Sequence, residues 1–334
     1  MPVSANNIWL NAVVANGSTG PFRHDSIGLV IPNLRVKRVF GENGRMTSLT
    51  ATGVWAAPLR YGDPSAAADA AAELEALGYG AIWVPDVGGD VFGSVENLLG
   101  ATSSLTVATG ILNLWMHEPE DASSEHARLT KAHGHRFLMG IGVSHAPLID
   151  SSEPGRYTKP LSRMRAYLDG LDAAPVPVAV EDRVLAALGP KMLDLAGERA
   201  AGTHPYLVTP EHTAVAREAL GSGKLVAPEQ AVVLATDPVE ARAIARSHLA
   251  GYLGLPNYTN NWKRFGFTDD DIADGGSDRL VDAFVAWGDE DAIVDRVQAH
   301  RDAGADHVCV QVLTADLWEL PLDEWRALAP SLTS

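Results

Sequence analysis

The chain has 334 residues, a formal net charge of −16 and a hydrophobic share of 46%. This length and apolar content suffice for a large core, and a single α/β barrel commonly has this size. The negative charge argues against nucleic acid or an anionic membrane as a partner, because both repel an acidic surface. The single cysteine, Cys309, excludes an internal disulfide, and its place among valines predicts an inert buried thiol.

No apolar run reaches the ~18 residues that a membrane-spanning helix needs. The chain also begins without the basic region and apolar core that mark a secretory signal. We therefore expect a cytoplasmic protein.

Residues 1–48 differ from the rest of the chain. Asparagine, glycine and proline interrupt short apolar pieces there, and no helical period persists. Met46 is an alternative start. We predict an N-terminal extension over residues 1–48 and one barrel domain over residues 49–334.

From Thr52 onward, short apolar runs alternate with helix-like stretches that end at a glycine. Glycine takes positive φ without a Cβ clash, so it ends a helix, and an apolar run directly after it favours a buried parallel strand. The predicted strands cover residues 53–59, 81–85, 105–114, 137–143, 184–188, 204–208, 231–234 and 307–313. Eight such strands predict a (β/α)8 TIM barrel of the α/β class.

The segment between the seventh and eighth predicted strands is too long for one helix. Helices are predicted over residues 237–252, 278–287 and 290–303, with an irregular stretch at 255–267. We interpret residues 254–262 as a lid or an interface element. The predicted fold is thus a TIM barrel with an insertion between its seventh and eighth strands.

A barrel of this type carries its chemistry at the carboxyl ends of the strands. The third predicted strand ends with Gly110, Ile111 and Asn113, and a glycine inside a strand marks a bulge or the close approach of a ligand. Two interpretations remain open. The glycine either fits a tight barrel layer, or it forms a bulge against a flat cofactor with Asn113 at the cofactor's polar edge.

The fourth predicted strand ends with Gly142, Val143, Ser144 and His145. This is not a dinucleotide fingerprint, because the third glycine and the following helix are missing. His145 could act as a general acid or base, since an imidazole titrates near neutral pH. The alternative, a hydrogen-bonded loop histidine without a catalytic role, is equally consistent with the sequence.

Two further strand ends carry polar groups. Gly189, Pro190 and Lys191 open a helix after the fifth predicted strand, which favours either a phosphate site or an ordinary proline-capped turn with a solvated lysine. Asp86 follows the second strand. Its side chain either faces the mouth of the barrel, which is the open end formed by the carboxyl ends of the strands, or caps the next loop. The histidines at 117, 133 and 135 lack the spacing of a metal site, so we predict no metal.

Five stretches resemble a known family: TGILNLW at 109–115, GIGVSHAP at 140–147, AALGPKM at 186–192, HPY at 204–206 and LPNYT at 255–259. They are similar to luciferase-like flavin or deazaflavin oxidoreductases of the bacterial luciferase superfamily, and more narrowly to an actinobacterial subgroup assigned to coenzyme F420. The resemblance extends from about Leu49 to the C-terminus and leaves residues 1–48 unexplained.

The resemblance implies that a cofactor ring lies over the strand mouths, against a non-proline cis peptide at Gly110–Ile111. Ser144 and Asn113 would hold the ring edge, and the phosphate side would lie near Gly142, Ser144, Gly189 and Lys191. The expected cofactor-binding residues are Asp86, Gly110, Ile111, Asn113, Gly142, Ser144, Gly189, Pro190 and Lys191. Several F420-dependent relatives place a catalytic histidine after the strand-2 aspartate, whereas Val87 follows Asp86 here. We therefore expect the catalytic acid to be His145, with His117 second.

The expected function is that of an F420-dependent oxidoreductase that transfers a hydride between the deazaflavin and a small organic substrate. One alternative is an FMN-dependent luciferase-like monooxygenase, and another is a non-catalytic barrel that binds flavin or deazaflavin. We expect a small-molecule substrate and a homodimer, with neither nucleic acid nor membrane as a partner.

Overall fold

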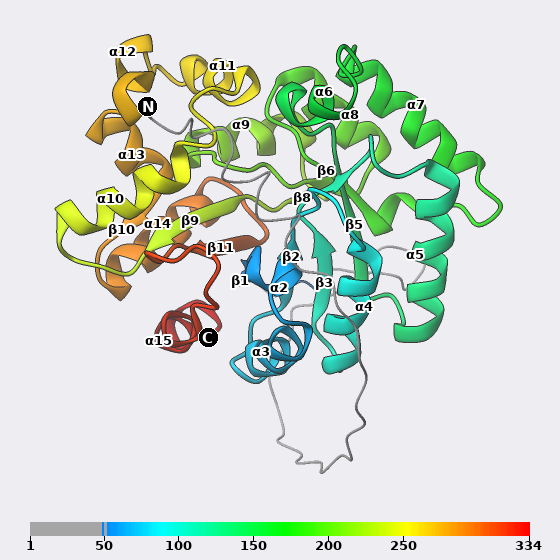
Figure 1. Ribbon diagram of the computed structural model, residues 1–334, viewed down its shortest axis with the longest axis horizontal. Coiled ribbons are helices and arrows are strands. Elements are labelled where there is room, and N and C mark those ends of the chain that lie inside the picture. Colours follow the sequence, from blue (N-terminus) through cyan, green and yellow to red (C-terminus); the bar gives the residue numbers. More distant parts are fainter. Residues whose placement is uncertain (1–48, 50–51) are drawn as a thin grey trace.

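The computed structural model describes residue 49 and residues 52–334, which form a parallel β-sheet surrounded by helices (Figure 1). The predicted extension over residues 1–48 lies outside the described residues. The strands are β1 (Thr52–Trp55), β2 (Ala81–Val84), β3 (Thr106–Thr109), β4 (Leu112–Asn113), β5 (Phe137–Gly142), β6 (Arg183–Leu185), β7 (Gly202–Thr203), β8 (Leu225–Val226), β9 (Glu229–Val233), β10 (Val285–Trp287) and β11 (Val308–Val312).

The strand order is β10-β9-β11-β1-β2-β3-β5-β6-β7-β8, with β4 beside β5. Strands β8 and β9 belong to one extended segment that is interrupted at Ala227 and Pro228. Strand β8 pairs with β7, and strand β9 pairs with β11. This one segment is therefore hydrogen-bonded to strands from both ends of the strand order. The sheet therefore follows a barrel-like course, and the prediction of a luciferase-type α/β barrel is confirmed at the level of fold.

Helices cover the outside of the sheet. They are α2 (Pro58–Tyr61), α3 (Pro64–Ala76), α4 (Val91–Ala101), α5 (Pro119–His133), α6 (Ala146–Ser152), α7 (Pro160–Ala173), α8 (Pro190–Arg199), α9 (Pro210–Leu220), α10 (Pro238–Leu249), α11 (Pro256–Arg264), α12 (Asp269–Ile272), α13 (Asp278–Phe284), α14 (Glu290–Asp302) and α15 (Leu322–Leu332), with 3₁₀ turns η2 (Val180–Asp182) and η3 (Ala273–Gly275). Many begin with proline, whose fixed φ and missing N–H suit a first helical turn. Within residues 52–334, no helix is both long and apolar enough to cross a membrane.

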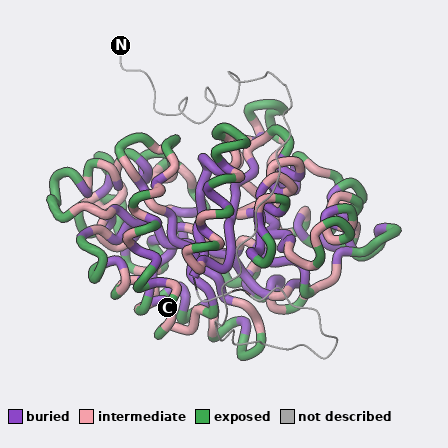
Figure 2. The backbone as a smooth tube through the Cα atoms, turned by 90° about the horizontal axis from the view of Figure 1, so that it is seen from below, coloured by how far each residue is buried: buried purple, intermediate pink, exposed green. Residues whose placement is uncertain are grey.

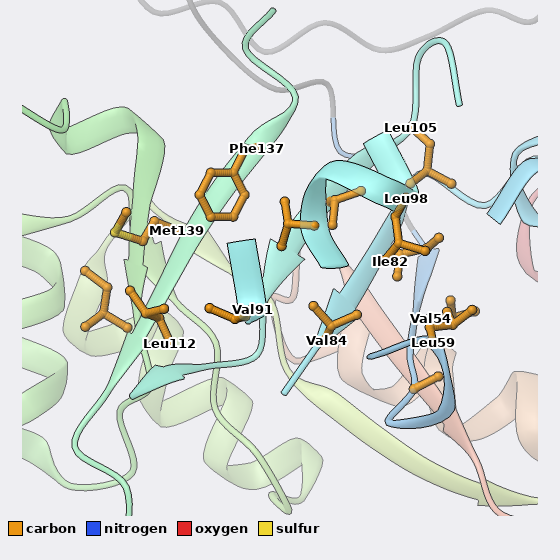
Figure 3. Packing of buried hydrophobic residues seen from close by; sticks show 14 of the residues in the cluster. Val54, Leu59, Ile82, Val84, Val91, Leu98, Leu105, Leu112, Phe137 and Met139 are labelled. Atoms are coloured by element: carbon orange, nitrogen blue, oxygen red, sulfur yellow. The ribbon is translucent and has the colours of Figure 1, made fainter. Parts of the chain in front are cut away.

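The buried residues follow the strands, and the exposed residues lie on the outer helices (Figure 2). One cluster fills the space between strands and helices, where Ile82 and Val84 of β2 pack near Leu98 of α4 (Figure 3). A second cluster lies inside the sheet and contains Trp83 and Cys309. Cys309 is fully buried, as predicted, and its burial raises the thiol pKa.

A third cluster joins the sheet to the long segment between β9 and β11. That segment holds α10, α11, α12, α13, β10 and α14. The prediction of an irregular stretch at 255–267 is wrong, because residues 256–264 form α11. This helix buries Tyr258 and Trp262. The predicted helix over 278–287 is wrong at its end, since Val285–Trp287 pairs with β9 as β10.

Several predicted strands end earlier than expected. The fifth, predicted at 184–188, is β6 and ends at Leu185. The first ends at Trp55, and Pro58–Tyr61 forms a helix instead. The sixth was predicted at 204–208, but only Gly202 and Thr203 form β7. Pro205 has no N–H to donate, and Leu207 has a positive φ of 50°, so the chain leaves the sheet there.

Candidate functional site

The third barrel strand is split between β3 and β4, and the Gly110–Ile111 peptide bond at the split is cis, as predicted. The Trp55 indole Nε1 donates a hydrogen bond to the Gly110 carbonyl over 2.9 Å. A Cβ atom on Gly110 would lie 2.7 Å from Trp55 Nε1 and 2.9 Å from His204 Nε2. Position 110 is therefore closely surrounded by the Trp55 and His204 side chains.

His204 is a buried neighbour of this bulge that the sequence analysis did not select as a site residue. Its Nδ1 lies 2.7 Å from the Ala227 carbonyl, so the proton belongs on Nδ1, and Nε2 has no hydrogen-bond partner among the described residues. The ring stacks on Trp83 with 4.0 Å between centroids. Burial lowers the His204 pKa to about 3, which keeps the ring neutral. The only sequence signal was its place in the HPY stretch.

Asp86 and His117 form a carboxylate–imidazole pair at the ends of neighbouring strands. Asp86 Oδ2 lies 2.8 Å from His117 Nε2 and also accepts the Asn113 N–H over 3.1 Å. Asp86 Oδ1 accepts the Gly88 N–H over 3.2 Å. The Asp86 side chain is fully buried, so its oxygens serve these protein groups and orient the His117 ring.

His117 also lines a cavity of about 440 Å³. Its lining includes Phe92 and Gly93 of α4 and Glu125 and Arg128 of α5. The Phe92 ring meets the His117 ring edge-on at 5.4 Å between centroids. His117 therefore has one nitrogen on the Asp86 carboxylate, and it also lines this cavity.

His145 lies in different surroundings, as the N-cap residue of α6 after β5. The sequence analysis expected no helix after this strand, so α6 corrects that expectation. Its ring lies 5.4 Å from that of Tyr258 on α11, and the Asn257 side chain hydrogen-bonds it. His145 Nδ1 is buried without a hydrogen-bond partner in the described part of the chain. Burial lowers the pKa of His145 to about 4, so the imidazole is neutral at pH 7.

The other predicted cofactor contacts lie on β4, on β5 and directly after β5. Asn113 is fully buried; its Oδ1 accepts the Trp115 N–H over 3.1 Å, and its Nδ2 has no partner among the described residues. Ser144 has a positive φ of 53°, and its carbonyl accepts a hydrogen bond from Tyr157 over 3.3 Å. A Cβ on Gly142 would lie 2.5 Å from the Ile111 side chain, so glycine there makes room for the bulge.

The sequence analysis missed an aromatic wall around Tyr206, whose ring lies 6.3 Å from that of Tyr258, the aromatic neighbour of His145. The Tyr206 hydroxyl lies 2.7 Å from Gln311 Oε1, 3.2 Å from the Tyr252 hydroxyl and 3.3 Å from His248 Nε2. The Tyr206 ring lies 5.3 Å from the Trp55 ring. Burial raises the pKa of Tyr206 well above its usual value, so the phenol stays protonated and serves as a fixed hydrogen-bonding group.

The predicted phosphate side lies at the start of α8. Gly189 is the N-cap residue and makes no side-chain cap, Pro190 follows it, and Lys191 is exposed. The guanidinium of Arg264 on α11 would lie 3.2 Å from a Cβ built on Gly189. Neither Lys191 nor Arg264 has an ion-pair partner among the described residues. Helices α6, α8 and α11 lie along one edge of the molecule (Figure 1).

Comparison with known proteins identifies the family of this chain. Residues 45–307 match the family model described as luciferase-like monooxygenase. A protein of Mycobacterium tuberculosis, named as a coenzyme F420-dependent oxidoreductase, is 24% identical over 320 residues; the alignment covers 75% of this chain and 91% of that protein.

Solved structures share the fold. An F420-dependent secondary alcohol dehydrogenase with an F420–acetone adduct has a TM-score of 0.67 at 14% identity, covering 85% of this chain and 99% of that one. The F420-dependent tetrahydromethanopterin reductase of Methanopyrus kandleri has a TM-score of 0.67 at 19% identity, covering 85% and 98%. An FMN complex of a Pseudomonas putida diketocamphane monooxygenase has a TM-score of 0.61 at 16% identity, covering 85% and 98%. Because the family model matches most of the chain, the protein belongs to the luciferase-like monooxygenase family.

Proposed function

We propose that the protein is a coenzyme F420-dependent oxidoreductase, which transfers a hydride between C5 of the deazaflavin and a small organic substrate. The observation that carries the proposal is the arrangement at the mouth. The Gly110–Ile111 bulge, the neutral His145 and the uncapped start of α8 all follow carboxyl ends of barrel strands. The F420-dependent relative and the two F420-dependent structural neighbours support this choice of cofactor.

The residues present fit an anionic cofactor. In the first turn of α8, Pro190 has no N–H, and the Met192 and Leu193 N–H groups donate to the Gly189 carbonyl. The Lys191 N–H and the positive end of the helix dipole remain for an anion, and no side chain caps the turn. Lys191 and Arg264 would add two cationic side chains from separate helices. These groups would bind the phosphate side of the cofactor, while Trp55 and Tyr206 would border the ring.

His145 would accept or donate the proton that accompanies hydride transfer. When bound, the deazaflavin supplies the two-electron chemistry at its C5 atom, and the protein supplies position and proton transfer. The neutral His145 imidazole can accept the proton of a substrate hydroxyl in oxidation and return it in the reverse direction. Tyr258 and Asn257 of α11 cover this ring and would exclude water from it.

A cofactor titration of the purified full-length chain tests the proposal. Saturable quenching of protein fluorescence by F420 at micromolar concentrations, followed by F420 reduction or reoxidation with a panel of alcohols, aldehydes and enones, is the expected result. Binding of reduced FMN with oxygen consumption, and no F420 binding, would instead identify a flavin monooxygenase like the FMN-binding neighbour. Tight F420 binding without turnover of any panel member would favour a non-catalytic barrel.

Lys191→Ala is expected to raise the cofactor dissociation constant by roughly tenfold, because the loss of one charge-assisted hydrogen bond weakens binding by about this factor. The value of kcat should stay nearly unchanged. Lys131→Ala is the matched control, because Lys131 is an exposed lysine on α5. Fluorescence titrations at two salt concentrations measure both variants. If Lys191→Ala binds F420 as tightly as the parent, the start of α8 is only a proline-capped turn.

A further inference from the structure

Glu229, at the start of β9, is a buried carboxyl group that the mechanism above does not use. It is 1% exposed, and its Oε2 accepts the Leu207 N–H over 3.0 Å. Its Oε1 has no hydrogen-bond partner among the described residues. A buried carboxyl group with one unpaired oxygen is costly, especially when charged, so its presence in the barrel needs an explanation.

Leu207 is held from two sides. It is a non-glycine residue with a positive φ of 50°, and it is 1% exposed. Its N–H donates to Glu229, and its carbonyl accepts the Trp262 Nε1–H of α11 over 3.3 Å. A leucine persists in this left-handed conformation only where its surroundings enforce it. Glu229 and Trp262 supply that enforcement.

The residue before Leu207 is Tyr206, which forms the aromatic wall of the mouth. The Tyr206 hydroxyl bonds to Gln311, and its ring packs against Trp55, which in turn holds the Gly110 carbonyl. The Glu229–Leu207 hydrogen bond fixes the Tyr206–Leu207 peptide and so restricts the backbone from which the Tyr206 ring projects. A continuous set of contacts connects Glu229 to the bulge.

The charge state of Glu229 follows from its neighbours. The titratable groups around it are Tyr206 after β7, Tyr252 after α10, Tyr258 on α11 and Cys309 on β11. His204 contacts Cys309 and His248 contacts Tyr206; burial lowers the pKa of His204 to about 3 and that of His248 to about 4, so both rings are neutral. None of these is a cation, and no described cationic side chain acts on Glu229. A carboxylate would therefore be an uncompensated buried charge, whereas a neutral acid leaves only one unpaired O–H.

We propose that Glu229 is a positioning residue, which acts as an uncharged carboxylic acid to fix the Leu207 turn and thereby the Tyr206 wall of the mouth. Burial raises the pKa of Glu229 to about 8, which agrees with this assignment. The inference concerns contacts within the chain, so it can be tested on the cofactor-free protein and does not depend on the cofactor proposed above.

The pH dependence has a defined sign. Between the ordinary glutamate pKa and about 8, the folded protein holds a proton on Glu229 that the unfolded chain releases. Stability from this group therefore falls as pH rises through that window and levels off above it. Glu229→Gln keeps an acceptor for Leu207 and a donor on the other side, and it cannot titrate. The difference between the melting temperatures of parent and Glu229→Gln is expected to be small at pH 5 and to reach several degrees in favour of Glu229→Gln at pH 9.

Melting curves of the full chain from pH 5 to 9 measure this difference, with Glu218→Gln as the matched control, because Glu218 is an exposed glutamate on α9. Amide hydrogen exchange at Leu207 is the second readout. Glu229→Ala should exchange at least tenfold faster there at every pH, and Glu229→Gln should restore protection. If Glu229→Ala does not fold, Glu229→Asp serves instead, since it titrates but is one methylene shorter.

Two results would overturn the inference. Parallel melting curves for the parent and Glu229→Gln across the pH range would show that Glu229 is not a neutral acid in the folded protein. Full protection of the Leu207 amide in Glu229→Ala or Glu229→Asp would show that the carboxyl group does not hold this turn. Either result would leave the cofactor titration, and thus the proposed function, unaffected.

Discussion

His145→Ala is expected to lower kcat on the order of 10²-fold, because the ring would accept or donate the proton of the reaction. Cofactor affinity should change little, since His145 is not proposed to bind the phosphate side. Steady-state kinetics and F420 titrations on the same preparations measure the two effects. His117→Ala is the comparison variant, since His117 also follows a barrel strand but pairs with Asp86.

The outcome assigns the proton-transfer group. If His145→Ala turns over normally and His117→Ala loses the activity, the Asp86–His117 pair is the acid–base group. If neither variant loses activity, the proton comes from another part of the mouth.

The pH profile gives an independent check on His145. Its lowered pKa, about 4, means that the neutral form predominates at any pH above that value. The rate of substrate oxidation should therefore stay level between pH 5 and pH 7, where an ordinary histidine would become protonated and inactive as a base. A decline in rate that is centred near pH 6.5 would contradict the buried, neutral state of this ring.

Gly110→Val is expected to disturb both the fold and the cofactor site, with the larger effect on the site. The new Cβ would lie within 3 Å of Trp55 and His204, which are both buried and cannot move away easily. Overpacking of this kind typically costs about 1–3 kcal/mol, so the melting temperature should fall by several degrees. Displacement of the Trp55 ring should weaken F420 binding further, because that ring would border the cofactor.

Gly100→Ala is the matched control, because nothing lies within 4 Å of a Cβ on this α4 glycine. It should melt at or slightly above the parent temperature, since alanine favours a helix more than glycine does. Thermal melts and F420 titrations of both variants complete the comparison. A Gly110→Val protein that melts and binds F420 like the parent would show that the bulge has room for a side chain.

Sequence alone was sufficient where local chemistry decides the structure. The prolines and capping residues that open the helices, and the glycines that end them, made the βα repeat readable. A glycine inside a strand marked position 110 for attention, although the residues left open whether it fits a tight layer or forms a bulge. The structure decides for the bulge, at the split between β3 and β4. His145 was selected for its place after a strand, although its buried, neutral state depends on α11, a helix more than a hundred residues away in sequence.

Tertiary structure alone decided which distant groups meet. The carboxylate of Asp86 contacts His117, 31 residues away, and that of Glu229 contacts the Leu207 amide, 22 residues away. Neither pair has a spacing that a helix or strand would bring together, so no periodic pattern could reveal it. Likewise, β10 forms because β9 offers an open edge to Val285–Trp287, although the preceding helix-like sequence favours a longer α13. Propensity acts over a few residues, whereas the pairing of a strand edge or a buried acid depends on what the rest of the fold places beside it.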